Sequence, residues 1–213
     1  MSLREKLRLI VITDKKLKPD IIKAVEDALK GGATSIQLRL KDSSTSEMIK
    51  VGKAIRRLTR DYGALYFVDD RLDVALATDA DGVQLGPDDM PIYIARELAP
   101  NLIIGGSAYS LEEAMRVERE GADFIGAGSV FPSPTKPDAR VIGLDGLREI
   151  VERVKIPVVA IGGINASNAE AVLRRGVVGM AVISAVMGAE DVYRATLELR
   201  KIVDMVLGYS KQH

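Results

Sequence analysis

Polar and apolar side chains alternate along one short segment of the sequence. Gln37, Arg39 and Lys41 are separated by the apolar residues Leu38 and Leu40. If this segment is a β-strand, its three polar side chains lie on one face, because successive side chains point to opposite faces. An amide beside two cations suits a diphosphate, whose oxygens accept charge-assisted hydrogen bonds. A charged strand end that only meets solvent would show the same pattern, so the segment alone leaves both interpretations open.

Acidic residues follow the next two apolar segments of the chain. Asp69 and Asp70 end the first of them, and Asp88 and Asp89 come shortly after the second. Carboxylate oxygens are hard ligands, which favour Mg²⁺ in a chain that has no cysteine or internal histidine to offer. The alternative is that Asp70 caps the helix after it and that Asp88 or Asp89 caps the next, the commoner role of an aspartate before a helix.

Two later segments could hold a phosphate group. Ser133, Thr135 and Lys136 lie in a loop stiffened by three prolines, where two hydroxyls and an amine could face a ligand. The same loop could equally be a rigid surface turn. Gly163 and Ser184 each follow a late apolar segment, and glycine allows backbone N–H groups to approach an anion closely.

Composition excludes several kinds of catalysis and partner. With no cysteine, and with His213 as the last residue and only histidine, thiolate chemistry, Ser-His-Asp triads and histidine-ligated metals are not expected. Lys and Arg number 30 and so do Asp and Glu, so no excess charge predicts nucleic acid as a partner. The longest uncharged apolar stretch, residues 176–189, is shorter than the roughly 20 residues of a membrane span. We therefore expect small-molecule substrates, no membrane partner and a cytoplasmic location.

Short β-branched runs alternate with longer amphipathic ones from end to end of the chain. Most of the short runs are continuously apolar, as in parallel strands that are covered on both faces. Strands are predicted over 7–13, 35–40, 65–69, 82–85, 102–107, 124–130, 158–161 and 180–184. Helices are predicted over 19–30, 46–62, 72–78, 91–98, 111–120, 143–153, 166–174 and 191–207. Ser110, with Glu113 following, is predicted to cap the start of a helix, and Gly31 and Gly121 stand where helices should end. Eight such units predict an α/β fold with a single domain over residues 1–213, a (β/α)₈ TIM barrel.

An open, doubly wound sheet is the structural rival. No G-x-G-x-x-G follows the first strand, where Thr13-Asp14-Lys15-Lys16 stands instead, so the barrel is favoured. Barrel enzymes place their sites at the carboxyl ends of the strands, and all the candidate residues above lie there. Two anion sites with a metal site between them indicate a reaction that joins a pyrophosphate ester to a second, phosphorylated molecule.

Together these motifs resemble the thiamine phosphate synthase family. The resemblance extends from residue 11 to Ser184. Its most specific parts are residues 37–41, Asp70-Arg71, residues 86–89, Ser133-Pro134-Thr135-Lys136 and Gly162-Gly163-Ile164. The resemblance implies a transferase on a (β/α)₈ barrel that joins 4-amino-5-hydroxymethyl-2-methylpyrimidine diphosphate to a thiazole phosphate. Thiamine phosphate and diphosphate would be released by a dissociative substitution that requires Mg²⁺.

The resemblance also implies roles for individual residues. One Mg²⁺ per subunit would be held by Asp70 and Asp89. The pyrimidine diphosphate would be bound by Gln37, Leu38, Arg39, Leu40, Lys41, Asp69, Ser107 and Lys136. Of these, the residues expected to act in catalysis are Arg39, Lys41, Ser107 and Lys136. The thiazole phosphate would be held by Ser133, Pro134, Thr135, Gly163, Ile183 and Ser184.

Three positions depart from the family's usual pattern. Leu40 replaces an acid, Asp69 replaces an asparagine, and Gln84 stands where relatives often have histidine. None of these changes removes a ligand that the reaction requires. Two alternatives remain at this point, the related thiazole tautomerase and a barrel that binds a phosphorylated ligand without catalysis. The sequence leaves open whether the chain forms a homo-oligomer.

Overall fold

Eight parallel strands form a closed barrel in sequence order, with β8 pairing back to β1. A computed structural model describes residues 1–135 and 137–208 of the chain. The strands are β1 (Leu9–Ile12), β2 (Ser35–Leu38), β3 (Leu65–Asp69), β4 (Gly82–Leu85), β5 (Ile103–Ala108), β6 (Phe124–Ala127), β7 (Val158–Ile161) and β8 (Gly179–Val182). The predicted (β/α)₈ barrel is confirmed, and the open sheet was the wrong alternative.

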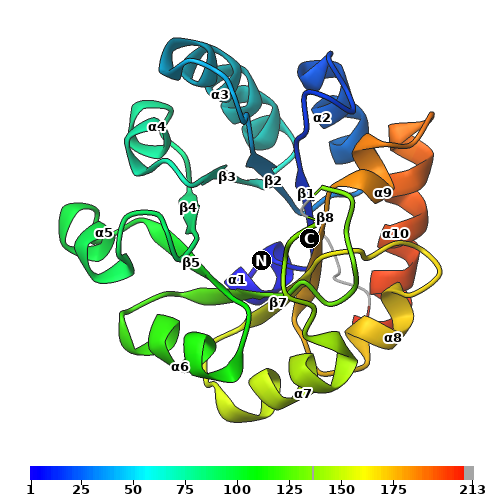
Figure 1. Cartoon of the computed structure of the whole chain (residues 1–213). Coiled ribbons are helices and arrows are strands. Elements are labelled where there is room, and N and C mark those ends of the chain that lie inside the picture. The colour runs from blue at the N-terminus through cyan, green and yellow to red at the C-terminus, as the bar shows by residue number, and fades with distance from the viewer. Residues whose placement is uncertain (136, 209–213) are drawn as a thin grey trace.

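Helices surround the barrel (Figure 1). They are α1 (Leu3–Lys6), α2 (Ile21–Lys30), α3 (Thr45–Asp61), α4 (Leu72–Ala77), α5 (Ile92–Leu98), α6 (Leu111–Arg119), α7 (Gly143–Arg153), α8 (Ala169–Leu173), α9 (Ser184–Met187) and α10 (Val192–Leu207). The short helix α1 differs from the others because it covers the end of the barrel where the strands begin. Its Leu3 packs on the barrel interior, and the carbonyl of Lys6 accepts a hydrogen bond from Ser35 Oγ at 2.6 Å.

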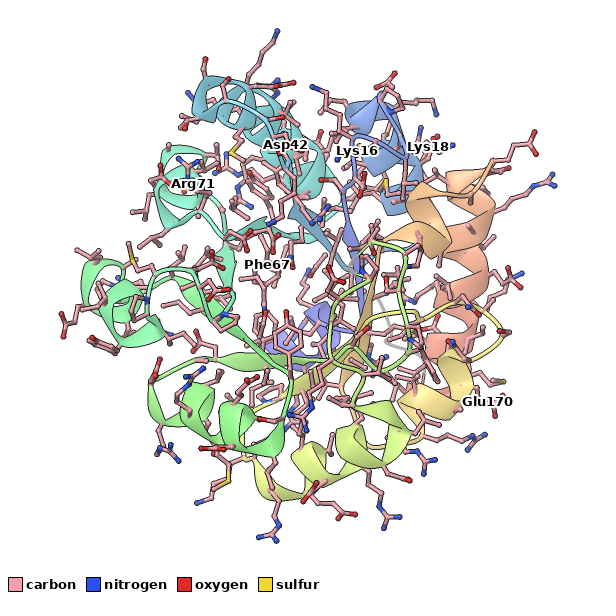
Figure 2. The ribbon with its side chains drawn as sticks, viewed as in Figure 1. Lys16, Lys18, Asp42, Phe67, Arg71 and Glu170 are labelled. Carbon is pink, nitrogen blue, oxygen red and sulfur yellow. The ribbon has the colours of Figure 1, made fainter. Side chains whose placement is uncertain are left out.

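The strands are apolar on both faces because they separate two cores. The outer core lies between the strands and the helices and includes Leu38 and Leu40. The inner core fills the start of the barrel with side chains from several strands, among them Phe67 and Phe124. Their rings meet edge to face with centroids 5.6 Å apart, and Figure 2 shows Phe67 inside the barrel. This filled half leaves the carboxyl ends of the strands as the only open half of the barrel within the described residues.

Most predicted element ends hold to within a few residues. The predicted cap of α6 is present, because Ser110 Oγ accepts a hydrogen bond from the backbone N–H of Glu113 at 3.2 Å. The prediction of a strand over 180–184 was too long, since β8 ends at Val182 and Ser184 begins helix α9. The strand predicted over 124–130 also ends early, at Ala127. Beyond this point Ser129 pairs with the backbone of Arg140 and Ile142, although the N–H of Val130 still donates to the carbonyl of Ile161 in β7.

Candidate active site

A cavity of about 400 Å³ opens at the carboxyl ends of the strands. Most of the predicted site residues line it, namely Gln37, Arg39, Lys41, Asp69, Asp70, Asp89, Ser107, Ser133, Thr135, Gly163, Ile183 and Ser184. These residues lie far apart in the sequence, and the barrel brings them to one opening. We call this opening, with the loops around it, the mouth.

Three predicted contacts do not line the cavity. The side chains of Leu38 and Leu40 are 2% and 3% exposed and pack in the outer core, as strand alternation requires. Pro134 is exposed on its loop, while its neighbours Ser133 and Thr135 reach the cavity. These three side chains therefore do not reach the cavity, and contact of their residues with substrate stays a prediction. Lys136, also predicted, lies outside the described residues.

The cavity has one polar wall and one apolar wall. On the polar wall, Gln37 Nε2 donates to Asp69 Oδ1 at 2.7 Å, and Gln84 Nε2 donates to Ser107 Oγ at 3.1 Å. Gln84 reaches inward because Gly105 and Gly126 leave room, and a Cβ on either glycine would overlap its amide. The apolar wall is formed by Ile10, Ile12, Val159, Ile161 and Ala181. The cavity can therefore hold a planar ring with hydrogen-bonding groups on one side.

The two predicted cations that the structure describes, Arg39 and Lys41, are held by carboxylates at the polar wall. Arg39 Nη1 donates to Asp14 Oδ2 at 3.2 Å, and its Nε lies 3.9 Å from Asp69 Oδ2. Lys41 Nζ donates to Asp70 Oδ2 at 2.7 Å, and this hydrogen bond raises the pKa of Lys41. Lys41 therefore remains charged at neutral pH, and both side chains line the cavity.

The carboxylates of Asp70 and Asp89 lie together at the mouth. Burial raises the pKa of Asp89, and the neighbouring Asp70 raises it further, while the backbone N–H of Gly86 donates to Asp89 Oδ2 at 2.6 Å. Two adjacent carboxylates repel each other unless a proton or a cation lies between them. Neither caps a helix, because α4 and α5 both begin without a side-chain cap. The capping alternative for these two residues was wrong.

This donor set fits Mg²⁺ in one particular way. No three acidic or histidine side chains converge on one point within residues 1–135 and 137–208, so a complete protein cage is not present there. Mg²⁺ commonly uses one or two carboxylates and takes its other ligands from water and from phosphate oxygens of the substrate. The pair Asp70 and Asp89 matches that pattern.

Asp69 is a mostly buried acid beside these groups, with its side chain 15% exposed. Its pKa is raised to about 7, chiefly by burial and further by the charge of Asp70, although Lys41 and Arg39 oppose the shift. The carboxyl group therefore titrates near neutral pH. The family usually has asparagine at this position. The carboxyl group of Asp69 therefore adds a negative charge here only when the pH is above about 7.

The glycine loop after β7 lies across the mouth from the cations. Gly162 and Gly163 have φ values of +101° and +65°, which L side chains rarely adopt. A Cβ on Gly163 would lie 2.5 Å from the carbonyl oxygen of Pro132. Among the described residues, the backbone N–H groups of Gly163 and Ile164 find no acceptor. They are therefore available to an anion in the cavity, which Ser184 at the start of α9 also lines.

Comparison with known proteins identifies the family. The model of the thiamine monophosphate synthase family matches residues 9–186. The chain belongs to this family. It is 69% identical to thiamine-phosphate synthase of Pyrococcus furiosus over 98% of this chain and 100% of that protein. It is 52% identical to thiamine-phosphate synthase of Methanococcus maripaludis over 95% of this chain and 98% of that one.

Solved structures agree with this assignment. Thiamine phosphate pyrophosphorylase from Pyrococcus furiosus superposes with a TM-score of 0.94 at 68% identity, covering 97% of this chain and 100% of that one. A 3-hexulose-6-phosphate synthase, at 22% identity and a TM-score of 0.67, covers 92% of this chain and 99% of that one and shares the fold alone. The high identities favour a thiamine phosphate synthase over the tautomerase and over a barrel that only binds. Within the described residues, no helix combines the length and apolar character that crossing a membrane demands.

Two residues near the site were not predicted from the sequence. Asp14 received no role, although its carboxylate contacts Arg39. Tyr109, directly after β5, lines the cavity and was not singled out. The position of Asp14 directly after the first strand was a signal for it, because the carboxyl ends of all the strands meet at the mouth.

Proposed function

We propose that the chain condenses 4-amino-5-hydroxymethyl-2-methylpyrimidine diphosphate with 4-methyl-5-(2-hydroxyethyl)thiazole phosphate, giving thiamine phosphate and diphosphate. The observation that carries the proposal is that the cations Arg39 and Lys41 line the same cavity as the carboxylates of Asp70 and Asp89, with Lys41 hydrogen-bonded to Asp70. This arrangement occurs in a chain 69% identical to a thiamine-phosphate synthase. The alternatives lack such support, since neither tautomerisation nor simple binding needs diphosphate chemistry.

The residues of the polar wall act on the leaving group. In a dissociative substitution the C–O bond to the diphosphate breaks first, and negative charge grows on the departing oxygen. Arg39 and Lys41 attract that charge more strongly as the bond breaks, so they lower the barrier as well as binding the substrate. Lys136 is proposed to act in the same way. Mg²⁺ bound by Asp70 and Asp89 would supply further positive charge to the diphosphate oxygens.

The opposite side of the mouth holds the nucleophile. The free N–H groups of Gly163 and Ile164, with Ser133, Thr135 and Ser184, would bind the thiazole phosphate. The thiazole nitrogen already carries its lone pair, so the capture step needs no general base. The apolar wall keeps water away from the pyrimidine methylene cation before the nitrogen captures it.

A coupled assay of diphosphate release tests the proposed function. With both substrates and Mg²⁺, diphosphate and thiamine phosphate should appear in equal amounts. Release of diphosphate without thiamine phosphate, or no release at all, would overturn the proposal. The cytoplasmic location expected from the sequence stays a prediction.

A further inference from the structure

Thr13 and Asp14 directly follow β1, and both form hydrogen bonds with Arg39. Thr13 is fully buried and Asp14 is 7% exposed, and neither lines the cavity. Thr13 Oγ1 accepts a hydrogen bond from the backbone N–H of Arg39 at 2.9 Å and donates one to its carbonyl at 3.0 Å. Arg39 lies just beyond the end of β2, so this hydroxyl replaces the backbone partner that the sheet no longer provides.

The two oxygens of Asp14 make separate contacts. Oδ1 accepts hydrogen bonds from the backbone N–H groups of Lys16 and Leu17 at 2.9 and 3.3 Å, which fixes the loop after β1. Oδ2 accepts the hydrogen bond from Arg39 Nη1 at 3.2 Å. Among the described residues nothing accepts a hydrogen bond from Arg39 Nη2, so that nitrogen is left for the cavity that Arg39 lines.

The loop alone does not explain a buried charge at residue 14. Asparagine forms the same turn through its side-chain oxygen without the desolvation cost of an ion. A carboxylate there also places a negative charge close to a site for an anionic ligand. A second link between the same two loops, Lys16 to Asp42 at 3.5 Å, lies on the surface with both side chains more than 80% exposed (Figure 2). An ion pair this exposed does little to fix the two loops relative to each other.

We propose that Asp14 is a positioning residue, which orients the Arg39 guanidinium toward the diphosphate group of the substrate while Thr13 fixes the Arg39 backbone. This inference rests on the proposed function of the cavity and adds residues outside it. Arginine has long, rotatable side-chain bonds, and a fixed guanidinium loses less entropy when it binds a phosphate. The negative charge of Asp14 weakens anion binding by repulsion, so the proposal requires orientation to outweigh repulsion.

Asp14→Asn separates these two effects because they have opposite signs. The asparagine can keep Oδ1 toward the loop, but its amide nitrogen cannot accept from Arg39. Affinity for inorganic diphosphate in the presence of Mg²⁺, measured by titration calorimetry, should fall by roughly tenfold. Unchanged or tighter binding would overturn the proposal, because it would show that only repulsion was removed.

A matched control and a double-mutant cycle exclude a general structural effect. Asp20→Asn removes a charge from the same loop, where Asp20 only caps α2, and it should leave diphosphate affinity unchanged. Combined with Arg39→Gln, the Asp14→Asn change should have no further weakening effect, because Asp14 acts through Arg39. Equal weakening in both backgrounds would contradict the proposal.

Thr13 provides an independent variant. Thr13→Ser keeps the hydroxyl and should retain diphosphate affinity, whereas Thr13→Val loses both bonds to Arg39 and should weaken it several-fold. Equal affinities for the two variants would remove Thr13 from the proposal. Diphosphate binding is measured without turnover, so failure of the positioning proposal is distinct from failure of the condensation assay.

Discussion

Replacing Asp69 by asparagine should make the protein more stable at high pH, and this gain should shrink as the pH falls. The Asp69 pKa is about 7 in the folded chain against an ordinary value of 3.8. A carboxyl group with a raised pKa contributes stability below its unfolded pKa, and that contribution is lost as the pH rises toward the folded pKa. Asparagine carries no charge at any pH and can still accept the hydrogen bond from Gln37.

The expected size follows from the shift. About three pKa units correspond to roughly 4 kcal/mol of unfolding free energy at pH 9, but to less than about 2 kcal/mol at pH 5. The Asp69 side chain is only 15% exposed, so solvent screens little of this difference. Asp69→Asn should therefore gain about 2–3 kcal/mol more at pH 9 than at pH 5.

Guanidinium unfolding followed by circular dichroism, with EDTA present, measures this difference. Asp73→Asn is a matched control of opposite sign, because hydrogen bonds from Arg71 lower the Asp73 pKa and the side chain is exposed. It should lose a little stability at pH 9. If Asp69→Asn shifts stability equally at both pH values, burial of an ionising carboxyl group is not the cause, and the reasoning is refuted.

Three further variants test the proposed roles. In steady-state assays, Asp89→Ala should lower activity by at least about tenfold. Full activity of this variant at low Mg²⁺ would reject the metal role of Asp89. Gly163→Val should raise the KM for the thiazole phosphate, because a side chain there displaces Pro132 and Phe131; equal weakening of both substrates by calorimetry would contradict the assignment. Lys136→Ala should lower kcat more than it raises the KM for the pyrimidine diphosphate, with partial recovery in Lys136→Arg; an unchanged kcat would reject its catalytic role.

The fold could be predicted from the sequence because its signals are local and repeated. Continuous apolar runs marked the strands, and Ser110 and Gly121 marked helix ends at positions the structure bears out. The helices α1 and α9 were missed because each has only four residues, too few for a periodic pattern. Helix α1 is linked to distant segments, since Lys6 forms hydrogen bonds with Ser35 and Gly63, and no local pattern records such contacts.

The site was harder to predict in detail. Strand alternation predicts that Leu38 and Leu40 point away from the mouth, whereas the resemblance assigned all of residues 37–41 to substrate binding. The structure agrees with the alternation, since both leucine side chains pack in the outer core. The space around Gln84 depends on glycines in β5 and β6. The orientation of Arg39 depends on its hydrogen bond to Asp14, just after β1. Such contacts follow from the register between strands, which the sequence of one strand does not contain.

The charges at the mouth link metal binding to diphosphate binding. At the mouth, the cations Arg39 and Lys41 lie among carboxyl groups that include those of Asp14, Asp69, Asp70 and Asp89. We call these six groups the charged cluster. With every group ionised, the charged cluster would repel a diphosphate. The pKa values of Asp69 and Asp89 are raised, and protonation of these two groups relieves part of the repulsion. A divalent cation between Asp70 and Asp89 would relieve it without a proton, so each of the two ligands should bind more tightly when the other is present.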